Sequence, residues 1–175
     1  MKRFRGPLLL TCCIFALFLF SSCTDQSEEI LGKLSEDFRK AAVTCAEQLE
    51  DGENYKAVSA AEDGTSVTFR VDENQWERAT VDEFTLTWDP QKGAVSSVEI
   101  CGLGELASSM LATNDWLFLL RSVIPEKDAP TALIQVEVSN FLSGALKEKL
   151  YCDGKYSLRY EGTKDRCCFT GELVK

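Results

Sequence analysis

The chain contains no histidine. This absence excludes Ser-His-Asp and Cys-His catalytic groups, and it excludes zinc or haem sites that need an imidazole ligand. There is also no Cys-x-x-Cys motif, which excludes the usual dithiol redox chemistry and the commonest spacing of zinc ligands. With 19 basic and 28 acidic residues, the net charge is −9, so we expect no nucleic-acid partner. The length of 175 residues is ordinary for one domain.

No apolar stretch is long enough for a transmembrane helix, which needs about 20 residues. The longest run, Leu8–Phe20, is broken by Thr11 and follows the basic residues Lys2, Arg3 and Arg5. A basic start and a short apolar run are typical of an export signal, which is removed from the mature protein.

The apolar run ends in Phe20-Ser21-Ser22-Cys23. Small residues directly before a cysteine resemble the lipobox of bacterial lipoproteins. The resemblance covers residues 1–23, and Phe20 departs from it because leucine is commoner there. It implies cleavage before Cys23, a diacylglyceryl thioether on its sulfur and acylation of the new amino group. Two or three acyl chains would anchor the protein stably at the cell membrane or outer membrane, on the extracytoplasmic side.

These signals predict three parts of the chain. Residues 1–22 form the signal peptide, residues 23–29 form the lipidated cysteine and a polar tether, and residues 30–175 form a single α+β domain. Removal of the signal peptide changes the net charge from −9 to −12. Such an acidic domain repels anionic lipid headgroups, so the anchor would hold it at the membrane.

Apolar spacing predicts two helices. Ile30–Leu49 has one apolar stripe and ends at Asp51-Gly52. Leu106–Ile124 reads as one helix or two pieces, with Asn114 or Asp115 as a cap. The five consecutive apolar residues from Trp116 to Leu120 predict a helix that is buried nearly all round. Residues 132–138 fit a strand and a helix equally well, and periodicity does not decide between them.

Turn signals between alternating segments predict antiparallel hairpins. Asp63-Gly64 separates residues 55–61 from 66–71, and Asp153-Gly154 would place Tyr151 opposite Tyr156 and Glu148 opposite Arg159. We therefore predict an α+β fold: an antiparallel sheet, flat or curved, with the N-terminal amphipathic helix and the central buried helix packed on it. At the level of the fold, this arrangement resembles half-barrel lipoprotein carriers, in which a curved sheet cups apolar helices.

Five cysteines remain after Cys23, and an odd number cannot all pair within one chain. The candidate disulfides are Cys45 with Cys101, and Cys152 with Cys167 or Cys168; buried free thiols are the alternative. Neighbours in a strand point to opposite faces, so Cys167 and Cys168 should not bond to each other. We expect no metal site.

One segment has the spacing of a dinucleotide-binding turn, Gly102-Leu103-Gly104-Glu105-Leu106-Ala107. However, Glu105 would repel a pyrophosphate, and strands joined by hairpins do not form the parallel sheet that such sites use. We therefore expect no cofactor.

The candidate ligand-contact residues are aromatic. Trp88, Trp116 and Phe118 would form part of the core or line an apolar pocket. Trp76 lies in a polar loop, where it would either fold onto the sheet or contact a partner.

The favoured interpretation is a membrane-anchored, non-catalytic binding module. It would hold an apolar ligand between the sheet and the helix containing residues 116–120. The alternative is an envelope protein that contacts a protein partner through its acidic surface or the Trp76 loop. A weaker alternative is a hydrolase in which Asp82, Glu83 and Asp89 meet at one end of the sheet.

Overall fold

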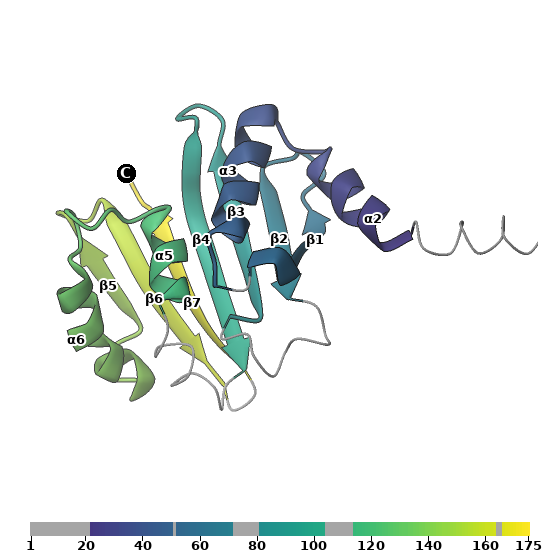
Figure 1. The fold of residues 1–175 in the computed structure, drawn as a ribbon. Helices are drawn as coiled ribbons and strands as arrows, with labels where there is room; N and C mark the ends of the chain where they lie inside the picture. Colours follow the sequence, from purple (N-terminus) through teal and green to yellow (C-terminus); the bar gives the residue numbers. More distant parts are fainter. Residues whose placement is uncertain (1–21, 51, 72–80, 104–113, 164–165) are drawn as a thin grey trace, which may run out of the picture.

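The computed structural model describes residues 22–50, 52–71, 81–103, 114–163 and 166–175. These residues form a seven-stranded antiparallel sheet in the order β1-β2-β3-β4-β7-β6-β5, and α3 and α5 lie on the same face of it (Figure 1). The α+β class is therefore confirmed. The strands are β1 (Tyr55–Ala60), β2 (Ser66–Val71), β3 (Glu83–Asp89), β4 (Ala94–Leu103), β5 (Glu148–Tyr151), β6 (Tyr156–Gly162) and β7 (Arg166–Leu173). The helices are α2 (Ser22–Leu31), α3 (Glu36–Glu47), the short η1 (Gly52–Asn54), α5 (Asp115–Arg121) and α6 (Thr131–Leu142).

The sheet consists of two meanders that meet at one pair of strands. The first meander is β1 to β4, and the second is β5 to β7. Strand β4 pairs with β7 from Ser97↔Glu172 to Leu103↔Arg166. We call this junction the β4–β7 seam. It joins segments that are far apart in the sequence, so every contact across it is long-range.

A disulfide between Cys101 and Cys168 crosses the seam. The two residues lie directly opposite each other in the register, with their Cα atoms 4.2 Å apart. The predicted pairings of Cys45 with Cys101, and of Cys152 with Cys167 or Cys168, were wrong. Cys45 is half-buried on α3, and Cys152 is exposed in the turn after β5; both remain free thiols. The sequence does not reveal that β4 and β7 are neighbours, and it is this pairing that selects the disulfide.

The strands have one apolar and one polar face, as the alternation predicts. Cys167 is buried on the helix-covered face, whereas Cys168 is half-buried on the other, so the prediction that they face opposite ways is confirmed. The apolar face carries Val67, Phe69, Phe84, Leu86, Val98, Ile100, Leu158 and Phe169. The described helices leave the opposite face uncovered (Figure 1). That face carries Thr68, Arg70, Glu83, Thr85, Glu99, Arg159, Glu161, Thr170 and Glu172.

The predicted helix Ile30–Leu49 is two helices, α2 and α3. Residues 32–35 between them are not helical. The Ser35 side chain caps α3 by accepting a hydrogen bond of 3.3 Å from the Phe38 N–H. The segment predicted as a polar tether is also different, because it belongs to α2. Ser27 of α2 docks on the edge of β1, where its Oγ accepts a hydrogen bond of 3.1 Å from the Ala57 N–H.

The hairpin predictions are confirmed, including Tyr151↔Tyr156 and Glu148↔Arg159. Residues 132–138, which periodicity left undecided, belong to helix α6. The central buried helix is α5, with Asn114 at its N-cap; residues 104–113 lie outside the described residues. Within the part of the chain that the structure describes, no helix combines the length and apolar character that a membrane crossing requires.

The disulfide generates a test of the seam. Its cysteines are 67 residues apart, and opening a loop of that size restores chain entropy worth about 4 kcal/mol to the unfolded state. We expect Cys168→Ala to lower the free energy of unfolding by about 2–4 kcal/mol, measured by urea denaturation. The control Cys152→Ala removes an exposed free thiol and should change it by less than about 0.5 kcal/mol. Equal losses in the two variants would contradict the role of the disulfide.

Candidate functional site

The predicted aromatic residues do not converge on one pocket. Trp88 of β3 is half-buried and stacks on Phe38 of α3, with ring centroids 5.3 Å apart. Trp116 of α5 is buried against Phe169 of β7, at 5.5 Å. Phe118, also on α5, is 36% exposed. Trp76 lies outside the described residues. The described members therefore pack on different helices and strands.

Helix α5 lies in direct contact with the sheet. A Cβ atom at Gly171 of β7 would meet Leu120 Cδ1 at 2.4 Å, so a larger residue there would displace the leucine methyl group from the sheet. Leu119 and Leu120 are fully buried. At this point the helix itself fills the space where the sequence analysis placed an apolar ligand.

The three carboxylates proposed as a catalytic group do not all meet. Asp82 directly precedes Glu83, the first residue of β3, whereas Asp89 is the last residue of that strand, about 20 Å away. Burial disfavours the charge of Glu83, but the guanidiniums of Arg166 and Arg70, at 2.7 and 2.6 Å, outweigh it and lower its pKa. Glu83 is thus an ion-paired carboxylate, and the prediction that all three acids meet at one end of the sheet was wrong for Asp89.

A cleft lies where α6, β5 and β6 meet, and its volume is about 710 Å³. This size is in the range of ligand-binding sites. Helix α6 ends at Leu142, and Gly144 takes a left-handed conformation (φ 72°) that turns the chain towards β5. The cleft is lined by Phe141, Leu142, Ser143, Gly144, Leu146, Lys147, Glu148, Arg159, Tyr160, Glu161, Gly162 and Thr163.

The cleft contains an unpaired stretch of strand edge. Strand β6 has seven residues, whereas its neighbour β5 has four. The last hydrogen bond on this side of β6 runs from the Tyr160 N–H to the carbonyl of Lys147, the residue directly before β5, at 3.0 Å. Along an antiparallel strand, the N–H and C=O groups of every second residue point to the same side. The Tyr160 carbonyl and the N–H and C=O groups of Gly162 therefore point to the side of β6 where β5 is no longer present. We call this stretch, Tyr160–Gly162, the open edge.

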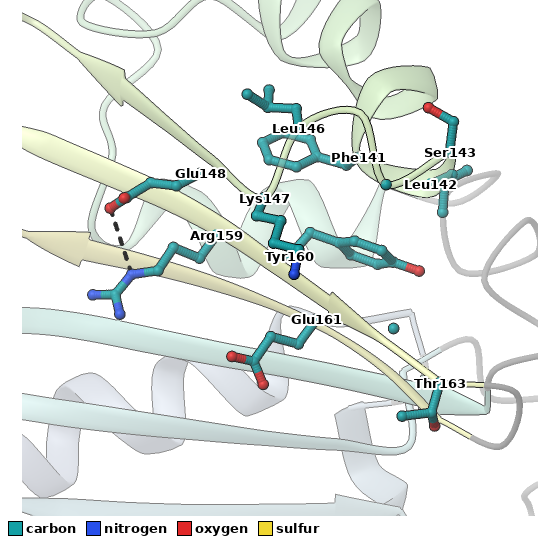
Figure 2. Close-up of a pocket in the computed structure, with 12 residues that line it drawn as sticks. Phe141, Leu142, Ser143, Leu146, Lys147, Glu148, Arg159, Tyr160, Glu161 and Thr163 are labelled. Carbon is teal, nitrogen blue, oxygen red and sulfur yellow. Dashed lines mark ion pairs between the residues drawn. The ribbon is translucent and has the colours of Figure 1, made fainter.

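The two sides of the open edge differ in chemistry. Figure 2 shows Phe141 and Leu146 on one side of β6 and Glu161 on the other. The apolar side is firm, since Phe141 is fully buried and meets Phe169 edge-on at 6.0 Å. On the other side, Arg159 pairs with Glu148 at 3.6 Å. Lys147 makes no ion pair with any described residue.

Titratable groups near the core are held neutral. Burial raises the pKa of the Cys167 and Cys45 thiols and of the Tyr160 hydroxyl. A raised thiol pKa lowers the thiolate fraction at neutral pH, which is the opposite of what a catalytic cysteine needs.

The cleft could not be predicted from the sequence, because it arises from unequal strand lengths and not from a motif. In comparisons with known proteins, no family, no curated protein and no solved structure matches the chain.

Tyr151 on β5 provides a test of how burial raises pKa values in this domain. Burial, and then the Glu137 carboxylate, raise its pKa to about 12, while its buried hydroxyl has no hydrogen-bond partner among the described residues. An unfolded tyrosine ionises near pH 10, so the folded protein should lose stability as the pH rises from 10 towards 12. Tyr151→Phe should remove this loss, and at pH 7 it should leave stability equal or higher because no hydrogen bond is broken. Urea denaturation of both proteins between pH 7 and 11 measures this; identical pH profiles would contradict it.

Proposed function

We propose that the chain is a lipid-anchored, extracytoplasmic binding module without catalytic activity, and that its cleft receives an extended segment of a protein partner. The observation that carries this proposal is the open edge of β6 inside a cleft of about 710 Å³. An exposed strand edge accepts another strand by main-chain hydrogen bonds, and neighbouring pockets select the side chains.

The opposite edge of the sheet supports this proposal by contrast. There α2 runs beside β1, and the Ser27 side chain accepts a hydrogen bond from an edge N–H group. Proteins cover or shorten sheet edges to prevent unwanted pairing. The open edge is a stretch that the described residues leave without such cover.

The two sides of β6 define the chemistry of the occupant. A segment that continues the line of β5 would alternate its side chains between the Phe141 side and the Glu161 side. Apolar side chains suit the first side and polar ones the second. Two exposed side chains of α6, Leu142 at the cleft and Val136 at 69% exposure, extend the apolar surface that a protein partner could cover.

The proposed anchor and the cleft lie at opposite ends of the sheet. Cys23 precedes Ser27 by one turn of α2, and α2 sits beside β1, whereas the cleft is beside β5 and β6 (Figure 1). Six strand spacings, or about 29 Å, separate the two edges. An anchor on Cys23 would present the cleft away from the membrane, which favours a protein partner over a lipid surface.

The resemblance to half-barrel carriers offers another site, between the sheet and α5. The direct contact of Leu120 with Gly171 occupies that position. We therefore place the binding site at the cleft.

The anchor has its own test. The full chain, expressed in a bacterium that processes lipoproteins, should yield a membrane-bound form that begins at Cys23 and carries the mass of two or three acyl chains. Cys23→Ser should abolish the added mass, whereas Cys12→Ser, in the segment that would be removed, should not. Intact mass spectrometry of the membrane fraction measures this. A wild-type protein with an unmodified Cys23 would refute the anchor.

The cleft is tested with a library of random eight-residue peptides displayed on phage and selected on the immobilised full chain. We expect enriched peptides to alternate apolar and polar residues and to bind with micromolar affinity in solution. Leu142→Asp, at the cleft, should weaken binding at least about tenfold, because it places a charge on the apolar side. The matched control Leu133→Asp lies on the same helix, and both leucines are 43% exposed.

Equal binding by the two variants would place the peptides elsewhere and refute the cleft. Absence of enriched peptides, with binding of a fluorescent fatty acid instead, would favour the apolar-ligand carrier.

A further inference from the structure

A row of facing residues crosses the uncovered face of the sheet. It runs Arg70–Glu83–Cys101–Cys168–Glu161 through strands β2, β3, β4, β7 and β6, each residue directly opposite the next. Glu99 lies two residues before Cys101 and points to the same face. The disulfide is thus surrounded by three carboxylates, those of Glu83, Glu99 and Glu161.

We propose that Cys101, Cys168 and Glu99 form a redox-controlled site for a divalent metal of the zinc class. The Cys101 and Cys168 sulfurs and a carboxylate oxygen of Glu99 all lie within 4.8 Å of one another. Two thiolates and one carboxylate are ligands that zinc accepts, and three protein ligands leave a fourth position for water. The disulfide form holds no free thiolate, so only the reduced protein would bind the metal.

The backbone permits this exchange without rearrangement of the strands. Two thiolates bound tetrahedrally to zinc at about 2.3 Å stand about 3.8 Å apart. The sulfurs reach that separation by side-chain rotation, because their Cα atoms are already 4.2 Å apart. Cys168 is half-buried, so an ion can reach the site from the uncovered face.

The surrounding charges favour a cation. Arg166 Nε contacts Cys168 Sγ at 3.4 Å, and this guanidinium would stabilise a thiolate there. Glu83 pairs with this guanidinium at 2.7 Å and with that of Arg70 at 2.6 Å, so these three side chains together keep one positive charge, which the two carboxylates of Glu99 and Glu161 outnumber. Glu99 and Glu161 are exposed and make no ion pair with any described residue. Their charges remain available to attract the ion.

The chemistry balances in two steps. A dithiol reductant, such as a thioredoxin-class protein, transfers two electrons and two protons to the Cys101–Cys168 disulfide and is itself oxidised to a disulfide. The metal then displaces one proton from each thiol and forms two metal–sulfur bonds, while Glu99 adds its carboxylate. A disulfide-containing oxidant of the thiol-oxidase class reverses both steps: it takes two electrons from the two thiolates and two protons from water, becomes a dithiol, and leaves the ion released and the Cys101–Cys168 disulfide closed across the seam.

From the sequence we expected no metal site, because the chain lacks the Cys-x-x-Cys spacing that zinc sites commonly use. The strand pairing supplies the proximity instead, by placing two cysteines 67 residues apart on neighbouring strands.

Cobalt binding tests the proposal. The full chain is reduced with a phosphine, freed of reductant without oxygen and titrated with Co²⁺, which absorbs in the near ultraviolet when thiolates bind it. We expect one Co²⁺ per reduced chain, displaced by Zn²⁺, and none bound to the oxidised chain. Cys168→Ala should abolish the absorption, and Glu99→Gln should weaken binding at least about tenfold.

The matched control is Glu172→Gln, because Glu172 lies on the same face and on the strand of Cys168. It should leave Co²⁺ affinity unchanged, as should Cys152→Ala, which removes an exposed free thiol. Absence of a one-to-one complex, loss of the fold on reduction, or equal effects of Glu99→Gln and Glu172→Gln would each overturn the proposal.

Discussion

The structure depends on the β4–β7 seam, because nothing else in the sheet joins its two halves. The first four strands form one meander and the last three form another, and each is stabilised by local turns. Across the seam there are seven register pairs and one disulfide. Helix α5 reinforces the junction from the covered face, where Trp116 contacts Phe169 and Leu120 contacts Gly171. The cleft also depends on the seam, since β6 pairs with β7 and β7 pairs with β4.

The parts of the fold that sequence predicted are those with a local cause. Aspartate–glycine pairs specify tight turns, and alternation then sets the register, so the pairing of Glu148 with Arg159 follows from the turn between them. The seam has no such local signal. Its strands are separated in the sequence by residues 104–165, and the sequence does not show which strand edges meet. The disulfide was assigned to the wrong cysteines for the same reason.

The helices show a second limit of pattern reasoning. The apolar stripe from Ile30 to Leu49 continues through the break between α2 and α3, so periodicity alone does not reveal the break. Helix α2 has already ended at Leu31, and Ser35 then starts the hydrogen-bond ladder of α3 by accepting a hydrogen bond from the Phe38 N–H. In α6 the ambiguity has a physical source. Val136 is apolar but exposed, so the apolar residues of this segment do not all lie on the buried face of the helix. The pattern of apolar residues therefore fits a strand as well as a helix.

No sequence motif predicts the candidate site, because the site exists where part of β6 has no neighbouring strand on one side. Its open edge exists because β5 begins only at Glu148, opposite Arg159, while β6 continues to Gly162. The sequence carries no local signal for it. In the register of this hairpin, Gly144 would lie opposite Thr163, beyond the end of β6, so the turn and the alternation alone would allow β5 to extend along the whole of β6. The chain instead turns away between α6 and β5, and the backbone of the longer arm is left exposed because its partner strand starts late.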